Sequence, residues 1–115
     1  MAIDDTDTID LLLRDKEGHA VLVITDHLDW AAAHEGDHLL LLQEKVNSYL
    51  AFVDSGQLLK ERPEWKGLPI VVQVAAMHEP SAKAVEFYQM AGKAIAEAGV
   101  SLELHLPQSG TTRRF

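Results

Sequence analysis

The stretch AVLVITDHLDWAAAHEGDHLLLLQEKVNSYLAFVDSG, residues 20–56, decides the fold because a strand, a turn and a long helix follow one another in it. Residues 20–26 are apolar on both faces of an extended chain, which is typical of a central strand. Over residues 39–53, apolar side chains recur at helical spacing and form a stripe. Asp37 is placed to cap the start of this helix and Gly56 to end it.

The flanking sequence predicts three further strands and a second helix. One strand precedes residue 20, and the short connection through Gly18 predicts a hairpin between the two. Pro80 suits the first turn of the second helix, and Gly99 is placed to end it. The expected order is strand, strand, helix, strand, helix, strand, over residues 9–15, 20–26, 38–55, 69–77, 80–98 and 100–106.

This order predicts an α+β fold, a two-layer sandwich in which two helices lie mainly on one face of a four-stranded mixed sheet. We expect one domain over residues 1–106 and a flexible C-terminal tail over 107–115. A helix that crossed the sheet and covered its other face remains an alternative, because the sequence does not fix the strand order. Leu40 and Leu41 widen the apolar surface of the first helix beyond one stripe, so this helix is expected to touch more than one surface.

The strands at 20–26 and 69–77 are apolar on both faces, whereas two helices on one side cover only one of them. A second copy of the chain is the simplest cover for the other face, so we expect a homodimer. The alternative is that Trp65, the tails and the loops cover it.

Charge and composition narrow the classes of partner. The net charge is −8, and residues 1–57 hold twelve acids against three bases. Nucleic acid is a poor partner for such a chain, whereas a basic protein surface suits it. The acidic N-terminus and the lack of a long apolar run predict a cytoplasmic protein with no membrane segment. The chain has no cysteine, which excludes disulfides and thiolate metal sites.

Histidines and carboxylates follow the strand at 20–26. His34 and His38 are four residues apart, and zinc accepts such ligands. Gly36 between them makes a continuous helix across the pair doubtful, so we expect no metal and no cofactor. Ordinary polar residues of a connecting turn are the competing interpretation, and the one we favour.

Two polar clusters also fall at the ends of two predicted strands. Asp26, His27 and Asp29 follow the first, and His78 and Glu79 follow the second. If those strands are parallel neighbours, both clusters lie at the same edge, where ligands often bind. An acid–base site is then conceivable, although polar residues are common at strand ends.

The turn DHLDW followed by HLLLLQEKVNSYLAF resembles a small bacterial family of uncharacterised proteins, a domain of unknown function, over about residues 9–106. The resemblance implies membership and no particular activity. It directs attention to a surface formed by the turn, with Trp30 in it, and the helix, which carries His38, Gln43 and Asn47. The matching residues are Ile9, Asp10, Asp26 to Trp30, His38, Leu39, Leu42, Gln43, Lys45, Asn47, Tyr49, Leu50, Phe52, Ser55 and Gly56.

Two hypotheses follow. The first is a non-enzymatic binding or interaction module, accessory or immunity-like, that presents an acidic face to a partner. The second is a small hydrolase-like or metal-binding protein that uses the clusters at the strand ends. The partner surface of the first hypothesis comprises Asp26, His27, Asp29, Trp30, His38, Gln43, Asn47, His78 and Glu79.

Overall fold

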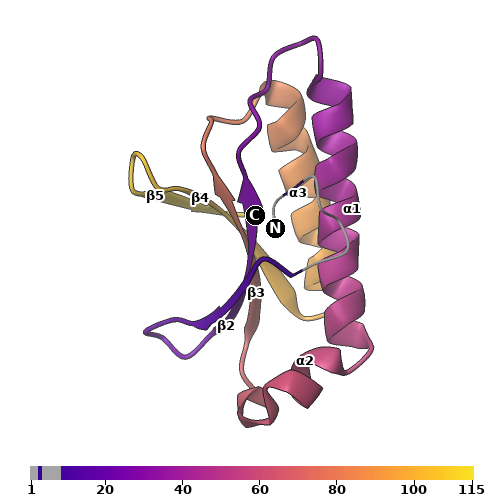
Figure 1. Cartoon of the computed structure of the whole chain (residues 1–115), viewed down its shortest axis with the longest axis vertical. Coiled ribbons are helices and arrows are strands. Elements are labelled where there is room, and N and C mark those ends of the chain that lie inside the picture. Colours follow the sequence, from indigo (N-terminus) through magenta and orange to yellow (C-terminus); the bar gives the residue numbers. More distant parts are fainter. Residues whose placement is uncertain (1–2, 4–8) are drawn as a thin grey trace.

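The computed structural model describes residue 3 and residues 9–115 of the chain, and they form one α+β sandwich (Figure 1). Among these residues, no helix is both long enough and apolar enough to cross a membrane. The elements in chain order are β1 (Leu11–Arg14), β2 (Ala20–Asp26), α1 (Glu35–Asp54), α2 (Gln57–Glu61), the 3-10 helix η1 (Pro63–Trp65), β3 (Ile70–Ala76), α3 (Ala82–Ala96), β4 (Val100–Leu106) and β5 (Thr111–Arg114).

The strands form one mixed sheet in the order β1-β2-β3-β4-β5. The three central strands are parallel, with Val21 opposite Val71 and Ile70 opposite Val100. Both edge strands are antiparallel to their neighbours. Each parallel pair is joined through a helix, because parallel neighbours need a long crossover connection. The α+β class and the mixed sheet are therefore confirmed.

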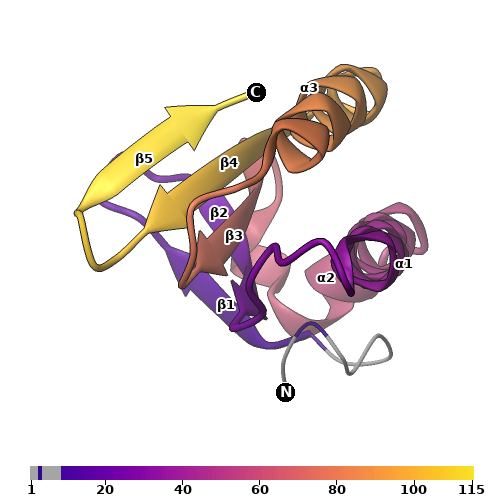
Figure 2. The ribbon, with the colours of Figure 1, turned by 90° about the horizontal axis from the view of Figure 1, so that it is seen from above.

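Both long helices cover the same face of the sheet, as Figure 2 shows from above. The core lies between these layers, because alternate residues of the central strands point toward the helices. It contains Leu22, Ile24, Val72, Val74, Leu102 and Leu104 from the sheet, and Leu42, Val46, Tyr49, Tyr88 and Ile95 from the helices. The expected placement of two helices on one face is confirmed.

The sheet has five strands and not the expected four, because β5 comes from the segment 107–115 that was predicted to be a tail. This strand pairs with β4, and Arg114 donates to Glu103 at 2.8 Å. Phe115 then stacks on Tyr88 of α3, with 5.1 Å between ring centroids. Phe115 and Tyr88 are distant in sequence, and the polar segment has no apolar periodicity to reveal its hairpin with β4.

The helix α1 begins earlier than expected. It starts at Glu35 and continues through Gly36, so Asp37 lies inside the first turn and is not the cap. A glycine costs a helix only about 1 kcal/mol, which tertiary contacts of the first turn can offset. Gly56 ends α1 as predicted, with a φ of +83° that glycine adopts readily.

The face of the sheet away from the helices has its own small apolar cluster. Val21, Val23 and Val71 are only 3–5% exposed there, although no described helix covers them, and Leu13 and Ala75 pack beside them. This face therefore shields its central valines largely with its own side chains. Because these valines are already buried within one chain, this face of the sheet needs a second copy of the chain less than the sequence suggested. The homodimer stays a prediction.

Candidate functional site

The ends of β2 and β3 lie at the same edge of the sheet, since Asp26 is opposite Ala76 in a parallel pair. The backbone N–H of Met77 donates to the carbonyl of Asp26 at 3.0 Å. The turn after β2 and the pair His78–Glu79 after β3 are therefore neighbours, which is the arrangement that parallel strands impose. The side chains at this edge divide into a buried group and an exposed group.

The buried group centres on His38 of α1. Its Nε2 lies 2.6 Å from Oδ2 of Asp26, and its Nδ1 lies 2.8 Å from the carbonyl oxygen of Asp29. Both side chains of the His38–Asp26 pair are almost fully excluded from solvent. The Trp30 ring stacks on the imidazole, with centroids 3.5 Å apart and planes 14° apart. Oδ1 of Asp26 also accepts from the N–H of Leu28 at 3.1 Å.

The hydrogen bonds define what this group can do. A carbonyl oxygen only accepts, so Nδ1 of His38 carries a hydrogen and donates to Asp29. One further proton lies between Nε2 and the Asp26 carboxylate, and both ring nitrogens are then used. These hydrogen bonds connect the DHLDW turn to the first turn of α1. They leave no free ring nitrogen on His38 to bind a metal or a substrate.

The exposed group contains Asp29, His34, His27, His78 and Glu79. Asp29 accepts from the N–H of Ala31 at 3.1 Å and forms an ion pair with His34. The Ala31 N–H, followed by His34, holds the pKa of Asp29 below its ordinary value, and the nearby His78 acts in the same direction.

The remaining exposed residues have separate contacts. Glu79 pairs with Arg113 of β5, and His27 is exposed. No three His, Asp or Glu residues of the described ranges are arranged to hold a metal ion. The strand-end residues are thus brought to one edge, but they do not converge on one atom.

A second buried polar network joins α1 to β2 and to Asp10, the residue before β1. The Lys45 ammonium, fully buried, donates to Oδ1 of Asp10 at 2.9 Å. The Tyr49 hydroxyl donates to the carbonyl of Val23 at 2.6 Å and accepts from the N–H of Asp10 at 2.8 Å. Oδ2 of Asp10 accepts from the N–H of Thr25 at 2.9 Å. Such a network requires every member to be paired, because a buried unpaired charge is costly.

The two networks explain several residues of the family resemblance. Asp10, Asp26, His38, Lys45 and Tyr49 are all used to attach α1 to the sheet. These contacts give the five residues a structural role.

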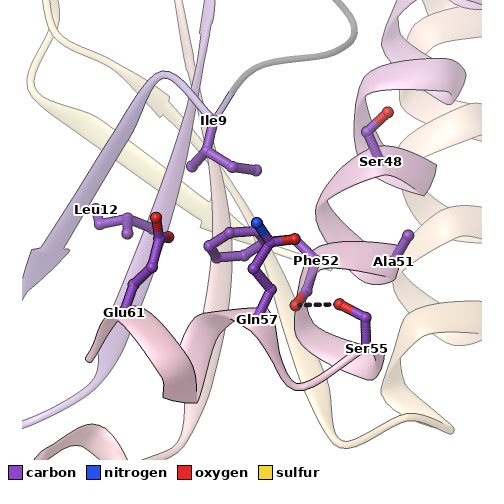
Figure 3. A pocket seen from close by; sticks show the side chains of 8 residues that line it. All are labelled: Ile9, Leu12, Ser48, Ala51, Phe52, Ser55, Gln57 and Glu61. Carbon is purple, nitrogen blue, oxygen red and sulfur yellow. Dashed lines mark hydrogen bonds between the residues drawn. The ribbon is translucent and has the colours of Figure 1, made fainter. Parts of the chain in front are cut away.

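One open hollow of about 710 Å³ lies between β1 and the helices α1 and α2 (Figure 3). Its lining mixes apolar and polar side chains, and Glu61 is its one charged group among the described residues. Ile9, one of its lining residues, is the first residue of the described range 9–115.

A groove between α1 and α3 lies on the outer surface of the helix layer. It consists of two adjoining hollows, of about 590 and 310 Å³, that share Gln43, Phe87 and Met90. One extends toward Gly36 at the start of α1 and the other toward Leu50 near its end. The further lining residues are Leu39, Leu40, Val46, Asn47, Lys83, Glu86, Ala91, Ala94 and Ile95. We call this feature the α1–α3 groove.

The predicted surface residues Gln43 and Asn47 belong to this groove and not to the strand-end edge. The sequence reasoning missed Met90 and Phe87, although the wide apolar surface at Leu40 was a signal for this side of α1. On α3, Met90 falls on the exposed side, away from the buried residues Ala84 and Tyr88. An exposed methionine outside the stripe was the other available signal.

No curated protein and no solved structure matches the chain. A family model, described as a family of unknown function, matches residues 1–108 and so includes the turn, the helix and both buried networks. The resemblance of the DHLDW turn and its helix is thereby confirmed, and the chain belongs to the family of unknown function DUF6572.

Proposed function

We propose that the chain is a non-enzymatic binding module whose contact surface is the α1–α3 groove. The observation that carries this proposal is the exposure of Met90, at 72%, and Leu40, at 54%. They are the two most exposed large apolar side chains among the described residues, and both line the same groove. Exposed apolar side chains that gather in one groove are typical of a protein-binding surface.

Polar groups in the groove support the same function. Gln43 and Asn47 are exposed and lie one turn apart on α1. Each amide offers both donors and an acceptor, so the pair can fix the register of a bound chain while the apolar walls supply affinity.

A strand-end acid–base or metal function remains the alternative, and Asp29 and His78 are the exposed residues that favour it. Against it stands the use of His38, whose two ring nitrogens are both bonded within the fold. The open positions of His27 and His78 also lack the enclosed, water-excluding surroundings that strengthen acid–base chemistry.

The two surfaces can be compared by affinity purification after chemical cross-linking in cells that naturally express the chain. One variant, Leu40→Ser with Met90→Ser, alters the groove, and the other, Asp29→Asn with His78→Ala, alters the strand-end edge. All four residues are exposed, so we expect melting temperatures near that of the wild type.

The proposal predicts that the groove variant loses proteins that the wild type and the strand-end variant both retain. Loss from the strand-end variant alone would refute it and favour the alternative.

A further inference from the structure

The rim of the α1–α3 groove is acidic on its α1 side. Asp37 and Glu44 lie two turns apart on one edge of α1, each next to a groove residue. Asp54 follows Leu50 by four residues and so lies in line with it at the far end. All three are exposed, and among the described residues none of them forms an ion pair.

Among the described residues, Lys83 is the one base that lines the groove, and it belongs to α3 and not to the acidic α1 side. Lys45 is the only lysine or arginine of α1, and it is buried and paired with Asp10 on the core side. Glu86 of α3 lines the groove together with Lys83, so the charges of these two side chains cancel there. The α1 edge therefore presents uncompensated negative charge beside an apolar channel.

The shape of the groove fits an elongated occupant. The helices α1 and α3, of 20 and 15 residues, are parallel to each other, because both return from the ends of parallel strands. At 1.5 Å per residue the shared length is about 22 Å, or about four turns of a further helix. Figure 1 shows the two helices side by side along the long axis of the molecule.

We propose, on the basis of the binding function above, that the α1–α3 groove receives an amphipathic helix of a basic partner protein. The apolar side of that helix lies against Leu40, Phe87 and Met90, in the manner of helix-in-groove recognition. Its lysines or arginines lie along the acidic α1 edge. Methionine suits such a surface because its flexible side chain adapts to different shapes.

Charge favours this occupant over a second copy of the chain. Each chain carries a net charge of −8, and two copies joined through this groove would bring two acidic α1 edges close together. A basic helix instead meets opposite charge along its whole length, which speeds association and selects against acidic competitors.

Fluorescence anisotropy with synthetic peptides tests the proposal on the full chain. The probe is a labelled peptide of about 16 residues with leucines at helical spacing and lysines on the other side, which is about 24 Å long as a helix. The first control has the same composition in an order that disperses the apolar stripe. The second has glutamate in place of each lysine.

The proposal predicts binding of the amphipathic basic peptide, with affinity that falls as salt is raised from 0.1 to about 1 M, where the screening length drops to about 3 Å. Leu40→Ser with Met90→Ser, which removes apolar contacts without changing the charge, should weaken binding more than about tenfold. Glu44→Gln with Asp54→Asn should weaken it about threefold to tenfold.

The matched control is Glu17→Gln with Glu64→Gln, which changes the net charge equally at exposed positions far from the groove residues in sequence. It should leave binding unchanged within about twofold. Equal weakening by both charge pairs would overturn the proposal, because attraction would then depend on net charge alone.

Three other outcomes would overturn it. The first is that the peptide with the dispersed apolar stripe binds as tightly as the amphipathic one, and the second is that neither peptide binds. The third is that light scattering shows a dimer of the chain, which Leu40→Glu with Met90→Glu separates into single chains. The last would place a second copy in the groove and would leave the binding function itself intact. Retained cellular partners with no peptide binding would likewise refute the basic helix alone.

Discussion

Replacing His38 with alanine should destabilise the protein far more than replacing His34, although both histidines pair with an aspartate of the same turn. The His38–Asp26 pair is buried, with His38 and Asp26 each only 1% exposed. The His34–Asp29 pair lies at the surface. The two variants therefore test the same kind of histidine–aspartate pair once in a buried and once in an exposed environment.

The magnitude follows from what each variant leaves behind. Removing His38 leaves the carboxylate of Asp26 buried without its main partner, which costs about 3–5 kcal/mol, and loses the Trp30 stack. Removing His34 breaks an exposed ion pair worth about 1 kcal/mol or less. A domain of this size loses about 4 °C in melting temperature per kcal/mol. We therefore expect a fall of about 12–20 °C for His38→Ala and of less than about 4 °C for His34→Ala.

Urea denaturation followed by tryptophan fluorescence measures both changes, with calorimetry for the melting temperatures. The double variant Asp26→Ala with His38→Ala completes a mutant cycle. It should cost less than the sum of its single changes, because it leaves no buried charge unpaired. A loss for His38→Ala no greater than for His34→Ala, or additive single effects, would refute the view that this pair holds the turn to α1.

Three further predictions follow from the fold. Gly92→Ala should destabilise the protein by about 1–3 kcal/mol in thermal unfolding, because the new Cβ would lie 2.7 Å from the backbone carbonyl carbon of Phe115. Alanine normally favours a helix, so an unchanged or higher melting temperature would contradict the packing of Phe115 against α3. Tyr49→Phe should cost about 1–3 kcal/mol in urea denaturation, because it removes the hydroxyl that bonds to the Val23 carbonyl and the Asp10 N–H. Tyr88→Phe should be nearly neutral, since the Tyr88 hydroxyl has no hydrogen-bond partner in the described part of the chain, and equal costs for the two variants would contradict this. Burial raises the pKa of both tyrosines, the only two in the chain, above the ordinary value of 10. Absorbance at alkaline pH should therefore show no phenolate until the protein unfolds, and the free energy of unfolding should fall as pH rises above 10. Phenolate in the folded protein near pH 10 would contradict the burial.

The sequence predicted the elements whose pattern is local. The strand at 20–26 shows a continuous apolar run within a short window, and both long helices show a helical period. The Gly18 connection likewise predicted the hairpin of β1 and β2. Their arrangement as a mixed sheet covered on one face followed from the order of elements and the geometry of parallel crossovers.

Other features depend on side-chain contacts that the apolar periodicity of the sequence does not reveal. β5 forms because Arg114 meets Glu103 and Phe115 meets Tyr88. His38 was expected at a partner surface, yet it is buried because Asp26 lies twelve residues earlier at the end of β2. The sequence correctly predicted that the strand-end residues lie at two neighbouring strand ends, but not which of them are buried.

The sequence indicated only the α1 side of the groove. Gln43 and Asn47 were chosen from the resemblance, and Leu40 was noted for widening the apolar surface of α1. That α3 supplies the opposite wall, with Phe87 and Met90, depends on two helices lying side by side on the sheet, which sequence spacing alone does not define.

Site-specific photo-cross-linking in cells tests the central claim most directly. A photoreactive amino acid is placed at Met90 or Gln43 in the groove, at His78 on the strand-end edge, and at Leu59 on α2 as an exposed control. The account predicts discrete adducts, identified by mass spectrometry, from positions 90 and 43 and none from 78 or 59. Adducts from position 78 alone, or equal adducts from all four positions, would contradict it.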